Sequence, residues 1–114
     1  MDANKIKKVY VVYKTHLDVG FTDLAKNVLD KYVNDYIPRS IDMAEQLNTG
    51  ENKVFVWTVG SFLIDYFFKN GSKEYCEKLK KAIKNGDICW HGLACTAHTE
   101  FLDEDLLDFD LSVS

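Results

Sequence analysis

A histidine and an aspartate, separated by one residue, stand where an apolar stretch of the chain ends. His16 and Asp18 follow the β-branched and aromatic run 9–13 and lie in the sequence KTHLDVGFTDL, residues 14–24. In extended backbone, side chains two residues apart project to the same side, about 6.5–7 Å apart along the chain, so both can converge on one ion. Imidazole nitrogen and carboxylate oxygen suit zinc, which binds such ligands at about 2.0–2.2 Å. The pair therefore predicts two zinc ligands; the alternative is a surface pair in which Asp18 helps to cap the next helix.

The other two histidines also follow a predicted strand. His91 comes directly after residues 87–90, and His98 and Glu100 lie a few residues farther on. Ligands of parallel α/β folds bind at the carboxyl ends of the strands, so we expect these side chains at the same edge as His16. The seven-residue gap between the two histidines does not fix a metal geometry, which favours a hydrogen-bonding role for both. With Glu100 they are candidate contacts to a substrate.

Strands and helices alternate along the chain in a way that would place those residues. We predict strands at 9–13, 54–59 and 87–90, each a short apolar run between turn signals. Helical periodicity covers 24–47, with a kink or break at Pro38, and then 62–69, 73–84 and 103–114. Ser61 and Ser72 are expected to cap the second and third helices, and Gly86 to end the third. This order predicts an α/β fold with a parallel sheet and right-handed crossovers.

Three parallel strands leave two open sheet edges, and no fourth strand is present in the sequence to close a barrel. We therefore expect residues 1–114 to be a single N-terminal α/β segment of a longer protein, with a small self-contained α/β domain as the alternative. Open edges also predict self-association through the sheet.

Composition limits the classes of partner. The 114 residues are 46% hydrophobic and carry a formal charge of −4, with one proline and scattered lysines, which indicates a folded domain and disfavours nucleic acid. No apolar run is long enough to cross a membrane and no signal peptide is recognisable, so a soluble chain is expected, in a compartment left open. Three cysteines without CxxC spacing predict neither a disulfide framework nor a structural zinc knot.

The stretch His16-Leu17-Asp18-Val19-Gly20-Phe21 resembles the His-x-Asp-x-Gly-aromatic motif of glycoside hydrolase family 38, the retaining α-mannosidases. Residues 55–66 and 79–88 are similar to two further blocks of that family in the same order. The resemblance spans almost the whole chain, is closest to a divergent branch, and is specific only in the first block.

This resemblance implies a fold, a cofactor and a substrate. The chain would be the front portion of a distorted (β/α)7-type barrel of the glycoside hydrolase and deacetylase kind. His16 and Asp18 would bind a catalytic zinc that holds two vicinal hydroxyls of mannose, and Phe21 would replace an aromatic platform for the sugar ring. The family's nucleophile and its remaining zinc ligands match no residue here, so the chain alone is expected to be inactive.

Two other functions fit the same residues. A metal-dependent carbohydrate deacetylase would use metal-bound water in place of a carboxylate nucleophile. A non-catalytic carbohydrate-binding or regulatory module would keep the fold without metal uptake. An amidohydrolase is less favoured, because its first strand should end in His-x-His and Lys14 stands where the first histidine is needed.

Overall fold

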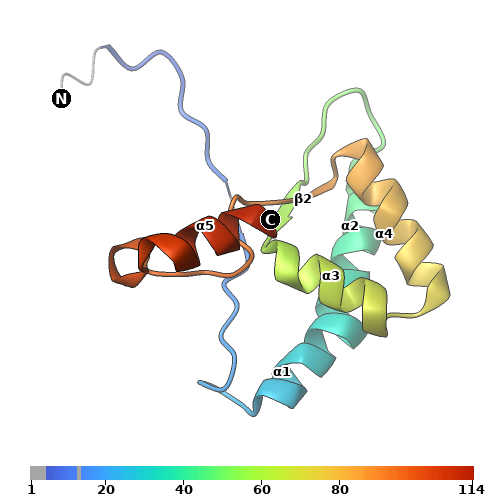
Figure 1. Cartoon of the computed structure of the whole chain (residues 1–114). Coiled ribbons are helices and arrows are strands. Elements are labelled where there is room, and N and C mark those ends of the chain that lie inside the picture. Colours follow the sequence, from blue (N-terminus) through green and yellow to red (C-terminus); the bar gives the residue numbers. More distant parts are fainter. Residues whose placement is uncertain (1–4, 13) are drawn as a thin grey trace.

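The computed structural model describes residues 5–12 and 14–114, and most of its regular structure is helical (Figure 1). One continuous helical stretch comes first, made of α1 (Ala25–Lys31), the π-helical turn η2 (Tyr32–Tyr36) and α2 (Ile37–Leu47). The elements that follow are β1 (Trp57–Val59), α3 (Ser61–Asn70), α4 (Lys73–Asn85), β2 (Ile88–Trp90), the 3-10 turn η3 (Thr99–Phe101) and α5 (Glu104–Ser112). Among these helices, none has both the length and the apolar character that a bilayer-crossing span requires.

The sheet of the described residues consists of two short parallel strands. β1 pairs with β2 in the register Trp57↔Ile88, Thr58↔Cys89 and Val59↔Trp90. The N-terminal segment adds a single parallel bridge between Lys14 and Thr58, next to which the Thr15 N–H donates to the Thr58 carbonyl at 3.4 Å. The Trp57 indole N–H donates to the Thr15 hydroxyl at 2.6 Å. The chain entering residue 16 is thus fixed beside β1 at one point.

The predicted fold class is wrong. A mostly helical chain with a two-stranded sheet is not the front portion of a (β/α)7-type barrel. Residues 9–12 form no strand and leave the body of the molecule as an extended arm, with Val9 72% and Val12 70% exposed (Figure 1). Tyr13 lies outside the described residues. The run has high strand propensity, but a strand also needs a ladder partner and covered faces, and residues 9–12 have neither.

The other two predicted strands are shorter than expected. The second begins at Trp57 rather than at Val54, and the third begins at Ile88 rather than at Asp87. Val54 is 72% and Val56 42% exposed, whereas Phe55 between them packs against the core. Among the described residues, ladder pairing is limited to β1 with β2 and to the single bridge between Lys14 and Thr58.

The hydrophobic core lies between the long N-terminal helical stretch, α3, α4 and β1. Its largest fully buried side chains are Phe67, Ile37, Ile41, Leu63, Leu79, Ile88 and Val59. A kink or break was predicted at Pro38, but the helical stretch is not broken there. It falls in the first turn of α2, directly after the π-helical turn. Proline has no N–H and so leaves one helical hydrogen bond unmade in any case. The change from α- to π-helical hydrogen bonding just before Pro38 therefore costs no additional bond at that residue.

Helix ends follow the sequence closely, with one exception. The Ser72 hydroxyl accepts from the Tyr75 N–H at 3.3 Å, and Gly86 ends α4 with φ +72°, as predicted. The predicted cap at Ser61 is wrong, because Gly60 precedes α3 and the Ser61 hydroxyl donates to the Val113 carbonyl at 3.2 Å. That bond holds the end of α5 against the start of α3.

Replacing Gly86 with alanine is expected to lower the free energy of unfolding by about 1 kcal/mol, because a side chain is disfavoured in the left-handed region. Gly50→Ala is the matched control, since Gly50 has no positive φ and no atom within 4 Å of an added Cβ. Urea denaturation of both variants measures the difference. Equal stability of the two would contradict a conformational role for Gly86.

Candidate metal-binding site

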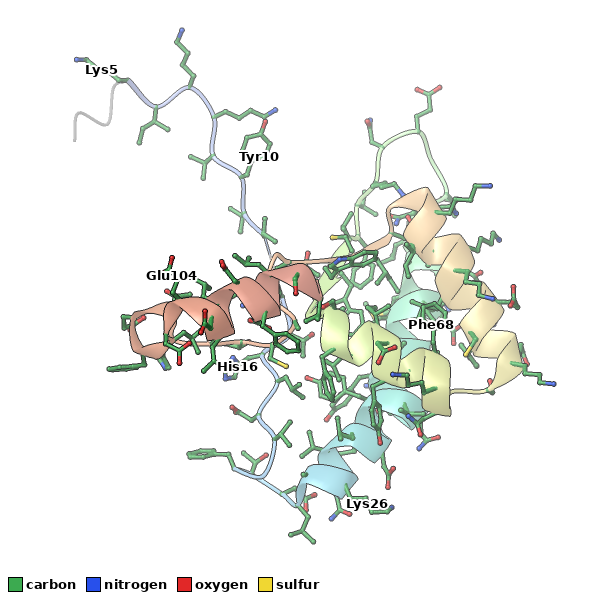
Figure 2. The ribbon with its side chains drawn as sticks, viewed as in Figure 1. Lys5, Tyr10, His16, Lys26, Phe68 and Glu104 are labelled. Carbon is green, nitrogen blue, oxygen red and sulfur yellow. The ribbon has the colours of Figure 1, made fainter. Side chains whose placement is uncertain are left out.

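His16 and Asp18 lie on the extended segment that runs from the sheet toward α1, where Figure 2 labels His16. Leu17, between them, packs against the hydrophobic core. Because side chains alternate in extended backbone, the two flanking residues then project away from the core. Their side chains are 59% and 47% exposed, and His16 Nε2 lies 2.9 Å from Asp18 Oδ1. The two groups come together as their spacing predicted; their role as ligands stays a prediction.

The turn after this pair explains how the chain reaches α1. Gly20 has φ +77°, a conformation that favours glycine, and reverses the chain direction there. Three bonds to the Asp23 carboxylate, from the Asn27 amide, the Lys31 ammonium and the Leu24 N–H, lower its pKa to about 2. Asp23 therefore stays ionised and serves the start of the helix, which makes it unsuitable as a proton donor.

Phe21 sits in the same turn and is 87% exposed. None of the aromatic pairs found among the described residues includes it. A solvent-exposed aromatic ring can pack against a sugar, although Phe21 is not among the residues that line the hollow beside His16 and Asp18. Its contact with a sugar stays a prediction.

A hollow of about 180 Å³ opens beside the His16–Asp18 pair. Its walls are formed by His16, Asp18, Thr22, Val28, Lys31, Tyr32 and Tyr36. The Tyr32 hydroxyl donates to the His16 carbonyl at 3.3 Å. Burial of Tyr32 raises the pKa of its phenol, and the neighbouring Tyr36 and Asp18 act in the same direction. The phenol thus remains a neutral hydrogen-bond donor at physiological pH.

Sequence reasoning missed Tyr32 and Lys31. Both belong to the first helical stretch. Tyr32 lies four residues after Val28, one helical turn along the same face, and is buried at 3% exposure. This spacing is the signal in the sequence that could have found Tyr32. It predicts that Tyr32 is buried, but it does not predict a bond to His16.

His91 makes three hydrogen bonds, two through its backbone and one through its imidazole, and its contact with a substrate stays a prediction. Its N–H donates to the Val59 carbonyl at 3.2 Å, its Nδ1 accepts from the Leu93 N–H at 3.4 Å, and its carbonyl accepts from the Ser114 hydroxyl at 2.9 Å. Burial lowers the pKa of its imidazole, with a further contribution from the Lys14 charge. His91 therefore connects the end of β2 to β1 and to the end of the chain.

His98 and Glu100 lie together at the start of η3 and interact with each other. His98 Nδ1 is 3.5 Å from Glu100 Oε1, with side chains 81% and 65% exposed. No hydrogen bond or ion pair among the described residues joins either of them to His16 or Asp18. Their contact with a substrate stays a prediction.

The donor atoms of the His16–Asp18 pair fit a zinc ion. Two ligands at about 2.1 Å from a tetrahedral ion lie roughly 3.4 Å apart, so a small rotation from the observed 2.9 Å admits one. Within residues 5–12 and 14–114 no group of three or more His, Cys, Asp or Glu side chains is arranged to hold a metal. The pair alone would supply two ligands, so a metal site at this position would need further donors.

Comparisons with models of known protein families, with curated proteins and with solved structures find no match for this chain. The likeness of residues 16–21 to the retaining α-mannosidase motif stays a prediction.

Proposed function

We propose that this chain supplies two zinc ligands, His16 and Asp18, to a glycoside hydrolase of the retaining α-mannosidase type. The observation that carries the proposal is the 2.9 Å approach of the imidazole nitrogen to the carboxylate oxygen, on the exposed side of a segment whose Leu17 is packed inward. His16 and Asp18 would hold the zinc, which would supply Lewis-acid chemistry that fixes and polarises substrate hydroxyls.

The chain's own residues have distinct tasks in this proposal. His16 offers a nitrogen lone pair, and Asp18 offers a negative charge that offsets the charge of the ion. Phe21 presents an apolar ring to a sugar. Retaining hydrolysis also needs two carboxyl groups about 5–5.5 Å apart, a nucleophile and an acid/base. The proposal gives neither role to a residue of this chain, so we expect the purified chain to bind zinc without cleaving glycosides.

Calorimetric titration with zinc tests the proposal. The unmodified chain is expected to bind one zinc ion saturably, and His16→Ala and Asp18→Ala to bind it more than about 100-fold more weakly. The reason is that residues that only orient metal ligands already contribute 10–100-fold. His98→Ala is the matched control, because it removes an exposed imidazole that has no contact with the pair.

Free thiols are the main competitors for zinc, and Cys95 is exposed. Titration with Co²⁺ distinguishes them, because thiolate ligands add intense charge-transfer bands that imidazole and carboxylate ligands do not. Absence of saturable binding, thiolate bands, or equal affinity in the His16→Ala variant would each overturn the proposal.

A further inference from the structure

Tyr32 is the one side chain of the long helical stretch that bonds to the backbone of the candidate ligands. Its hydroxyl donates to the His16 carbonyl at 3.3 Å across sixteen residues of sequence, and the side chain is 3% exposed. A buried phenol needs a hydrogen-bond partner, and here the partner is the peptide that carries a ligand side chain. The helix and the extended segment are thereby joined at the site itself.

The local helix geometry holds this phenol in place. Tyr32 is the first residue of the five-residue π-helical turn that ends at Tyr36. The two rings pack edge to face, with centroids 5.1 Å apart and planes at 90°. π-Helical turns are rare and are frequent at functional sites. Both rings line the hollow beside His16 and Asp18, so the turn faces the candidate site.

Two anchors therefore fix the segment that carries the ligands. The Tyr32 hydroxyl holds the carbonyl of His16, and the Leu17 side chain packs against the core. With the backbone of residues 16 and 17 held from the inner side, alternation sends the His16 and Asp18 side chains outward together. On the N-terminal side, Thr15 is bonded to Thr58 and Trp57, so the Tyr32 hydroxyl is the bond that holds the His16 carbonyl between Thr15 and Leu17.

We propose that Tyr32 is a positioning residue of the zinc site, whose hydroxyl fixes the His16 backbone so that the His16 and Asp18 side chains meet. Its consequence for zinc affinity rests on the proposed function, whereas its effect on the metal-free segment does not. Tyr32 itself contacts neither the ion nor a substrate.

Nuclear magnetic resonance of the metal-free chain tests the positioning directly. Tyr32→Phe is expected to shift the backbone amide signals of His16, Leu17 and Asp18 and to increase their fast motion. Tyr75→Phe is the matched control, because it also removes one tyrosine hydroxyl, which joins α4 to Asp42 of α2 at 2.9 Å and makes no bond to residues 16–18. Signals of residues 16–18 that are unchanged in Tyr32→Phe, or changed equally in both variants, would overturn the proposal.

Zinc titration of the same variants gives the second measurement. Tyr32→Phe is expected to bind zinc about 10-fold more weakly than the unmodified chain, and Tyr75→Phe with unchanged affinity. Equal affinity of Tyr32→Phe and the unmodified chain would overturn the positioning role. If the unmodified chain bound no zinc, the proposed function would fail, and the metal-free spectra would still decide whether Tyr32 orders the segment.

Discussion

Replacing Phe67 with alanine is expected to lower the free energy of unfolding by about 3–5 kcal/mol. Phe67 is the largest of the fully buried side chains, at 0% exposure on α3. Its ring lies directly beneath Gly71, where an added Cβ would approach ring carbons to 2.9 Å. The surroundings are thus closely packed around the ring, and its removal would leave a cavity. Urea denaturation followed by circular dichroism measures the loss.

Phe68→Ala is the matched control for this prediction. Phe68 is the next residue of α3, is labelled in Figure 2, and is 37% exposed. It should lose less than half as much stability, because a partly exposed ring gives up less transfer free energy and leaves no closed cavity. Equal losses in the two variants would place the core elsewhere. A chain of this length has about 6–17 kcal/mol of total stability, so Phe67→Ala removes a large fraction of it.

The helices could be predicted because their signals are local. Apolar residues at three- and four-residue spacing marked α3 and α4 to within a residue of their observed bounds. Ser72 and Gly86 act through bonds and dihedral angles within their own turn, which the sequence contains in full. The predicted cap at Ser61 is wrong because the Ser61 hydroxyl bonds instead to Val113, fifty-two residues away, a partner that the local sequence does not contain.

The sheet could not be predicted because strands depend on partners that are distant in sequence. The run 9–12 has the composition of a buried strand, yet composition does not say what will pair with it or cover it. In the structure, only Lys14 forms a bridge with Thr58, and the arm before it stays exposed. The parallel sheet predicted from the three apolar runs, and the barrel implied by the resemblance, both require residues 9–12 to pair as a strand, and these residues form none.

In the candidate site, too, local features could be predicted and contacts between distant residues could not. The approach of His16 to Asp18 was predictable, because a spacing of two in extended backbone is a local property. Tyr32 was not, because its contact with residue 16 depends on the π-helical register and on where the helix packs. His98 and Glu100 were expected at the same sheet edge as His16, because ligands bind at the carboxyl ends of parallel strands. That expectation requires a strand before His16, and residues 9–12 form none.

Asp87 directly precedes β2 and is buried, at 8% exposure. Its carboxylate accepts from the Asn48 amide at 2.8 Å and pairs with the Lys53 ammonium. Asn48 in turn donates to the Phe55 carbonyl at 2.7 Å, which ties the loop 48–56 to the start of β2. Burial opposes the charge of Asp87, but the bonds from Lys53 and Asn48 outweigh it and hold its pKa below the ordinary value of 3.8.

Asp87→Asn is expected to lower the free energy of unfolding at pH 7 by about 1.5–3 kcal/mol, the range for hydrogen bonds to a charged group. The pKa of Asp87 is lower in the folded than in the unfolded chain, so its contribution is complete above pH 4 and is lost as the pH falls through the folded-state pKa. The variant should lack that acid-dependent loss. Asp65→Asn is the control. The Asp65 side chain, which pairs with Lys69, is 61% exposed, so this pair should contribute less than about 1 kcal/mol to the free energy of unfolding. Urea denaturation from pH 7 to pH 2 measures both, and parallel pH profiles of Asp87→Asn and the unmodified chain would contradict the prediction.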